Sequence, residues 1–176
     1  MSELEGHTIE EIERLAAAAE AEAQEARDKS MSAETAAGKW MLENEADIKE
    51  AKANYWRAEV SRREVEAEYS EAKTKVEREF LSAMVECWSV MVEYHLTQSS
   101  FLAALAAYMR AEAEGKAEAI AEAWEEVLKW KAQVEDWSAQ VGSCRTKAEI
   151  SRCDWAIEYE KWATKNISFV KRVSLP

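Results

Sequence analysis

Proline and glycine are nearly absent from this sequence, which has one proline and four glycines among 176 residues. Soluble proteins contain roughly 5% proline and 7% glycine on average, and β-sheets joined by tight turns need these residues at the turns. Alanine, glutamate, lysine and leucine, which are strong helix formers, dominate the remaining positions. The composition therefore predicts an all-α fold.

Residues that carry out catalysis or bind metals are also scarce, with two histidines and three cysteines. Neither His7 nor His95 follows the Glu-x-x-His pattern of di-iron bundles, and no cysteine pair has zinc-site spacing. Cys87 and His95 would lie about 12 Å apart along one helix, too far for a nucleophile and its base. No glycine-rich phosphate loop is present. We therefore expect no enzymatic activity, and no catalytic, cofactor-binding or metal site.

Positive charge is in the minority, with 23 lysines and arginines against 35 acidic residues and a net charge of −12. Such a surface repels nucleic-acid phosphates and disfavours anionic membrane surfaces. The longest uninterrupted apolar segment, residues 101–109, has about half the length of a membrane span. An odd number of cysteines and no secretory signal predict free thiols in a reducing intracellular compartment, either the cytoplasm or an organelle matrix after removal of a presequence.

Residues 1–37 predict an acidic N-terminal helix followed by a joint. Thr8 and Glu11 match a capping box that would begin this helix. Apolar residues then recur at spacings of three and four: Ile9, Ile12, Leu15, Ala19, Ala23 and Ala26. Because alanine buries little area, this helix needs a larger neighbour for stability. Serine, threonine and Gly38 make residues 28–38 the expected joint.

Residues 38–114 predict one dominant long amphipathic helix, spanning either 39–96 or 39–114. An apolar heptad pattern, interrupted by Arg62, includes Ile48, Ala51, Tyr55, Ala58, Val65, Tyr69, Ala72 and Val76. After a change of phase it continues through Phe80, Met84, Cys87, Met91, Tyr94, Gln98 and Phe101. The serines of residues 97–100 favour a bend or break there.

Residues 115–165 predict a tryptophan-rich antiparallel helical hairpin. Its first helix, 116–141, has an apolar stripe of Ile120, Ala123, Val127, Trp130, Val134, Trp137 and Val141. Gly142 would end this helix, and a capping box of Thr146 and Glu149 would begin a second one over 147–165. Its apolar faces would include Trp155, Tyr159 and Trp162. Residues 166–176 alternate apolar residues around Lys171 and predict an extended, basic, partner-binding tail.

Eight tryptophans require an explanation in so charged a chain. Proteins that bind single-stranded nucleic acid combine aromatic rings with basic grooves, and the surroundings here are acidic. Aromatic side chains bury large areas and are enriched at protein–protein interfaces. We therefore expect the rings to pack between helices, some of them against another chain.

Residues 77–105, "EREFLSAMVECWSVMVEYHLTQSSFLAAL", resemble the late helix of a BAR-type membrane-curvature domain. This resemblance implies three long helices of similar length and basic faces that bind lipid.

The sequence thus predicts an elongated α-helical bundle with one dominant helix and a C-terminal hairpin. Its predicted function is that of a non-catalytic structural or accessory subunit. It would dock on a larger protein assembly through aromatic-rich helix faces and the C-terminal tail. The alternative is a self-associating coiled-coil homodimer that acts as a scaffold or as a BAR-like membrane-shaping module.

Overall fold

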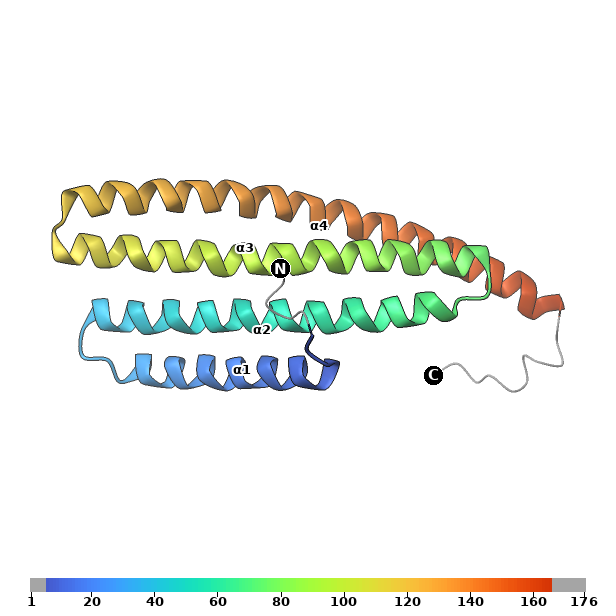
Figure 1. Ribbon diagram of the computed structural model, residues 1–176, viewed down its shortest axis with the longest axis horizontal. Helices are drawn as coiled ribbons and strands as arrows, with labels where there is room; N and C mark the ends of the chain where they lie inside the picture. Colours follow the sequence, from blue (N-terminus) through green and yellow to red (C-terminus); the bar gives the residue numbers. More distant parts are fainter. Residues whose placement is uncertain (1–5, 166–176) are drawn as a thin grey trace.

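The computed structural model describes the backbone of residues 6–165 and the side chains of residues 6–152. This part of the chain forms four α-helices and no β-strand (Figure 1). The helices are α1 (Ile9–Met31), α2 (Ala36–Glu71), α3 (Lys75–Glu114) and α4 (Ala117–Lys165). The predicted all-α fold is confirmed. The predicted tail, residues 166–176, and the side chains of Trp155, Tyr159 and Trp162 lie outside the described residues.

The helices follow one another in chain order, each antiparallel to the next, and the C-terminal part of α4 crosses α3 obliquely (Figure 1). Contacts join α1 to α2, α2 to α3 and α3 to α4, and no other pair of these described helices is in contact. The elongated helical bundle is therefore open: α1, α2 and α3 form a layer, and α4 packs along α3 and crosses it toward the C-terminal end of α4. A layer of this kind cannot enclose one central core, so its apolar side chains are buried along the contacts between neighbouring helices.

The first helix and its joint are found where the sequence predicts them. Thr8 and Glu11 form the expected capping box, and the chain reverses after Met31. The alanine stripe of α1 is buried against α2, and Ile12 alone among the large described side chains is fully buried. Ile12 packs with Tyr55 and Val60 of α2. The α1–α2 contact is thus close, because its residues are mostly small.

The predicted single long helix is wrong, because the chain breaks at residues 72–74. Ala72 is extended, and a capping box of Thr74 and Glu77 begins α3. The Thr74 hydroxyl oxygen accepts a hydrogen bond from the Glu77 N–H at 3.1 Å. This T-x-x-E pattern is visible in the sequence, and it ends one helix and begins the next without glycine or proline.

The expected break at residues 97–100 is also wrong, because α3 continues through this segment. The Ser100 hydroxyl donates to the Leu96 carbonyl oxygen at 3.1 Å, so the preceding turn of the helix satisfies it. Thr97 and Ser99 are buried. Serine and threonine here are small residues at helix contacts and do not interrupt the helix.

The predicted C-terminal hairpin is wrong as well, because α4 runs without a break across Gly142. The Thr146 hydroxyl donates to the Gly142 carbonyl oxygen at 3.1 Å instead of capping a new helix. The spacing of the apolar stripe continues beyond Val141 to Cys144 and Ala148, which are both buried. Packing against α3 therefore continues across the glycine and outweighs its weak helix propensity.

Candidate interaction surface

Cys87 and His95 are the described residues that the sequence suggested as a nucleophile and its base. Burial raises the pKa of Cys87, and the nearby Cys144 raises it further, so the thiol stays protonated. Burial lowers the pKa of His95, although a hydrogen bond with Gln98 opposes this shift, so the imidazole is mainly neutral near pH 7. Cys87 and His95 are about 12 Å apart along α3 at 1.5 Å per residue. They therefore do not form a nucleophile–base pair.

Two further features concern metals and membranes. Among the residues described here, no group of three His, Cys, Asp or Glu side chains is placed to hold a metal ion. No helix within that same part of the chain is long and apolar enough to cross a bilayer.

The free surface of the layer is the main candidate for function. The helix α3 contacts α2 on one side and α4 on the other, which leaves two uncovered sides. On one of them an open groove of about 470 Å³ runs between α3 and α4. It is lined by Phe80, Met84, Cys87, Trp88, Met91, Arg145, Ala148, Glu149 and Arg152. We call this side of the layer the methionine face.

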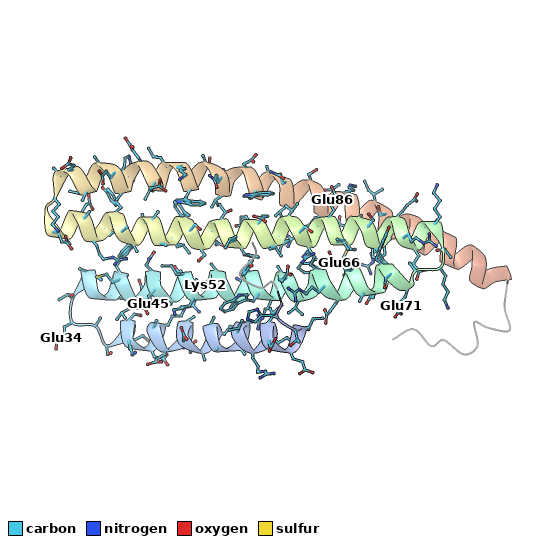
Figure 2. The ribbon with its side chains drawn as sticks, in the orientation of Figure 1. Glu34, Glu45, Lys52, Glu66, Glu71 and Glu86 are labelled. Carbon is cyan, nitrogen blue, oxygen red and sulfur yellow. The ribbon has the colours of Figure 1, made fainter. Side chains whose placement is uncertain are left out.

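An acidic hollow lies beside this groove, at the turn between α2 and α3. Its lining residues are Glu68, Glu71, Lys73, Glu77, Phe80 and Leu81. Figure 2 shows Glu71 at the C-terminal end of α2. Because Phe80 lines both the groove and the hollow, they lie on the same face. The methionine face is thus mainly acidic at α2 and apolar along α3, and at α4 it carries Arg145, Glu149 and Arg152.

The opposite side of the layer, which we call the alanine face, has different chemistry. A groove of about 600 Å³ between α3 and α4 is lined by Ser100, Ala103, Ala104, Ala107, Ala111, Ala119, Glu122, Ala123, Glu126 and Trp130. A hollow of about 500 Å³ between α2 and α3 includes Trp40, Met41 and Ala106. At about 100° per residue, Ala107 lies roughly 160° around α3 from Met91. The two grooves therefore open on opposite faces.

The tryptophans with described side chains lie at the helix contacts and along these grooves. Trp130 and Trp137 are half-buried on the α4 stripe, as the heptad spacing predicts. Trp124 is 46% exposed, and its ring centre lies 5.1 Å from that of Tyr108 in α3. Trp40, Trp88 and Trp130 line the grooves and the hollow. The rings thus pack at the edges of the helix contacts, and part of their apolar surface lines the neighbouring grooves.

Arg145 and Arg152 of the methionine face were not singled out by sequence reasoning. Their spacing places them on one side of α4, but only the fold shows that this side borders an apolar groove. Comparisons with models of protein families, with curated proteins and with solved structures found no match. The function is therefore inferred from the surface chemistry of the layer.

Proposed function

We propose that this chain is a non-catalytic structural subunit that docks on a larger protein assembly through the uncovered faces of its helical layer. The open arrangement carries this proposal: α2 and α3, the central helices, each have a neighbour on two sides only. Helices with more apolar surface than their neighbours cover are typical of partner-binding proteins. The basic tail, with Lys171 and Arg172, is a second element of the proposed docking.

The alanine face supports docking of a partner helix. Small side chains such as Ala103 and Ala107 let another helix approach closely, so that its ridges fit between α3 and α4. Trp130 borders this groove, and the nearby hollow contains Trp40 and Met41, of which Met41 is 51% exposed. Large rings beside a shallow apolar groove are typical of residues that contribute most to binding. The expected partner is therefore an amphipathic helix of another protein.

The test places a charge in this groove without disturbing the layer. Ala107 is exposed, so the substitution Ala107→Glu should leave helicity and the unfolding midpoint nearly unchanged. Tagged wild-type protein and Ala107→Glu are then purified from the cells that produce the protein, and the co-purifying proteins are quantified. We expect a defined set of proteins to be lost with Ala107→Glu.

The matched control is Ala132→Glu, which also adds a carboxylate to an exposed alanine. Ala132 lies on α4 about 140° around the helix from the buried Val127, and so faces away from α3. This control should retain the same co-purifying proteins as the wild type. Equal recovery of all proteins by wild type and Ala107→Glu would show that the alanine face is not a docking surface.

The alternative function, a self-associating scaffold, is supported by one specific observation on the methionine face. There, Arg145 and Arg152 outnumber Glu149 beside the groove, whereas the neighbouring hollow contains Glu68, Glu71 and Glu77 with Lys73, so the two net charges have opposite sign. A surface with this pattern is complementary to itself.

A further inference from the structure

We propose that Cys87 of α3 and Cys144 of α4 are a redox-sensitive pair, which a small-molecule disulfide such as glutathione disulfide converts into an intramolecular disulfide bond. The bond fastens α4 to α3, which is the only described helix that α4 contacts. This inference goes beyond the proposed docking function, because it concerns covalent chemistry within one chain. Three observations support it: the burial of both thiols at one helix contact, their levels along the helices, and the groove beside Cys87.

Both thiols are buried at the contact between α3 and α4. Cys87 and Cys144 are each 9% exposed, and both are free cysteines. Because α4 contacts α3 alone among the described helices, the burial of Cys144 places its side chain against α3. Cys87 faces α4, since it lines a groove together with Arg145 and Ala148. The two side chains therefore enter the same helix contact from opposite sides.

Two other contacts between the same helices show that the thiols lie at one level. The ring centres of Tyr108 and Trp124 are 5.1 Å apart. Lys147 of α4 pairs with Glu86 of α3, which is labelled in Figure 2. In antiparallel helices, each step toward the N-terminus of α3 matches one step toward the C-terminus of α4. Counting from either contact places the two cysteines within about two residues of each other, or roughly 3 Å along the helix axes.

The separation expected at this level suits a disulfide bond. Packed helix axes lie about 8–10 Å apart, and each Cα atom lies about 2.3 Å from its own axis. Two facing Cα atoms with an offset of about 3 Å along the axes are then roughly 4.5–6 Å apart. Disulfides join Cα atoms that are about 4.4–6.8 Å apart. Cys87 and Cys144 can therefore be joined without moving the helices apart.

The third cysteine, Cys153, is not placed to pair with either thiol. Its main chain belongs to the same helix as Cys144 and lies about 13 Å further along the axis. Antiparallel counting places it about eight residues of α3 away from Cys87, or roughly 12 Å along the axes. Both separations exceed the Cα distance of about 7 Å at which a disulfide is still formed. The fold thus selects one of the three cysteine pairings.

The groove on the methionine face gives an oxidant access to Cys87. Cys87 lines this open groove of about 470 Å³. Burial raises the pKa of Cys87 and Cys144 raises it further, whereas the Arg145 guanidinium lowers it. Only a small fraction of Cys87 is therefore thiolate near pH 7, and its attack on an oxidant is slow. We expect the pair to stay reduced at rest in a reducing compartment and to respond to a sustained rise in glutathione disulfide.

The reaction consists of two exchange steps with glutathione disulfide as the oxidant. The Cys87 thiolate attacks one sulfur of glutathione disulfide, which forms a mixed disulfide and releases one glutathione thiolate. The Cys144 thiolate then attacks the Cys87 sulfur of this mixed disulfide and releases the second glutathione thiolate. The two released thiolates take up the two protons that the cysteines have lost. The protein thiols are thus oxidised by two electrons, and glutathione disulfide is reduced to two glutathiones.

The first experiment treats the reduced, folded full chain with excess glutathione disulfide, alkylates the remaining thiols and maps the disulfides by peptide mass spectrometry. We expect a bond between Cys87 and Cys144 as the main intramolecular product. The same chain unfolded in urea is the reference. There, the bond between Cys144 and Cys153 should dominate, because it closes the shortest loop.

Serine variants test the pairing and its effect on stability. Cys153→Ser should keep the bond, whereas Cys87→Ser and Cys144→Ser should lack it. In the Cys153→Ser chain, oxidation should raise the midpoint of thermal unfolding by roughly 10 °C, because the bond closes a loop of about 57 residues. Dithiothreitol should reverse this shift. The matched control, which combines Cys87→Ser with Cys153→Ser, should unfold at the same temperature with and without the oxidant.

Several outcomes would overturn the proposal. They are a folded chain that forms no intramolecular disulfide, a glutathione adduct on Cys87 that Cys144 does not displace, and the same pairings in the folded and unfolded chains. An oxidised Cys153→Ser chain that unfolds at a lower temperature than the reduced one would also overturn it, because the bond would then force the helices apart. These measurements need no partner protein, so this proposal and docking at the alanine face can fail separately.

Discussion

The side-chain amide of Asn44 in α2 donates a hydrogen bond to the main-chain carbonyl oxygen of Leu102 in α3, with a nitrogen–oxygen distance of 3.3 Å. Asn44 is 6% exposed, so this contact is shielded from water. It joins the two central helices at a single level and thereby specifies their register.

Replacing Asn44 with alanine should therefore lower the free energy of unfolding. The loss should be about 1–2 kcal/mol, since a buried hydrogen bond and its packing are both removed. Urea unfolding followed by circular dichroism measures it. Asn54→Ala, on the same helix, should change the free energy of unfolding by less than about 0.5 kcal/mol. Equal losses in the two variants would show that the Asn44 contact does not specify the register.

Two glycines in different conformations should respond to alanine in opposite directions. Gly115 ends α3 with φ of +68°, a left-handed conformation that disfavours a side chain. Gly115→Ala should therefore lower the free energy of unfolding by about 1 kcal/mol. Gly142 lies inside α4, and an added Cβ would meet no atom within 4 Å. Gly142→Ala should raise the free energy of unfolding by about 0.5–1 kcal/mol.

Chemical denaturation of both glycine variants tests the continuity of α4 as well as the cap. A Gly142→Ala protein that is less stable than the wild type would indicate a turn at this position, as in the hairpin that the sequence suggested.

The carboxylate of Glu59 explains why Arg62 interrupts the apolar heptad pattern of α2. The Glu59 side chain is 6% exposed. Its carboxylate accepts hydrogen bonds from Arg62 at 2.7 and 2.8 Å and from Arg63 at 2.8 Å. Burial alone raises the pKa of Glu59, but the hydrogen bonds from both arginines outweigh it and hold the pKa below its ordinary value of 4.5. Arg62 thus occupies an apolar position because its charge is neutralised there.

Glu59→Gln should lower the free energy of unfolding at pH 7 by about 1–3 kcal/mol, because the arginines lose their charged acceptor. Since the pKa of Glu59 is lower in the folded state, its stabilising contribution is complete above pH 4.5 and is lost as the pH falls through the folded pKa. The free energy of unfolding of Glu59→Gln should therefore fall less between pH 7 and pH 3.5 than that of the wild type. Unfolding of wild type, Glu59→Gln and the exposed control Glu64→Gln at pH 7 and pH 3.5 measures the difference.

His95 should produce a separate dependence on pH. Because burial lowers its pKa below 6.5 in the folded state, the unfolded chain binds a proton more readily. The wild type should therefore lose stability as the pH falls below about 6.5, in a window above that of Glu59. His95→Leu should reduce the difference in unfolding free energy between pH 7.5 and pH 5.5. The control His7→Ala should keep the full difference.

Sequence reasoning succeeded along the middle of each helix and at the ends near Thr8, Met31 and Gly115, and it failed at residues 72–74 and at Gly142. The stripes through Tyr55 of α2 and Val127 of α4 are buried or half-buried apart from the exposed Tyr69, because periodic spacing records which side of a helix faces a neighbour. The break before Thr74 and the continuity at Gly142 were mispredicted. A helix end depends on a few local hydrogen bonds and on whether packing continues beyond it. The presence of a glycine alone therefore does not show that a helix ends there.

The amino-acid sequence by itself determined the helical class and the apolar sides of the helices, since both depend on propensity and spacing within a few turns. Met84 and Met91 were thus recognisable as apolar positions, whereas nothing in the sequence indicated that Arg145 and Arg152 border the same groove. Only the tertiary structure decided that α1 contacts α2 alone and that α3 lies between α2 and α4. The apolar sides of the helices can pair in several ways, and their packing over the described part of the chain selects the arrangement in which each helix contacts only its neighbours in the chain.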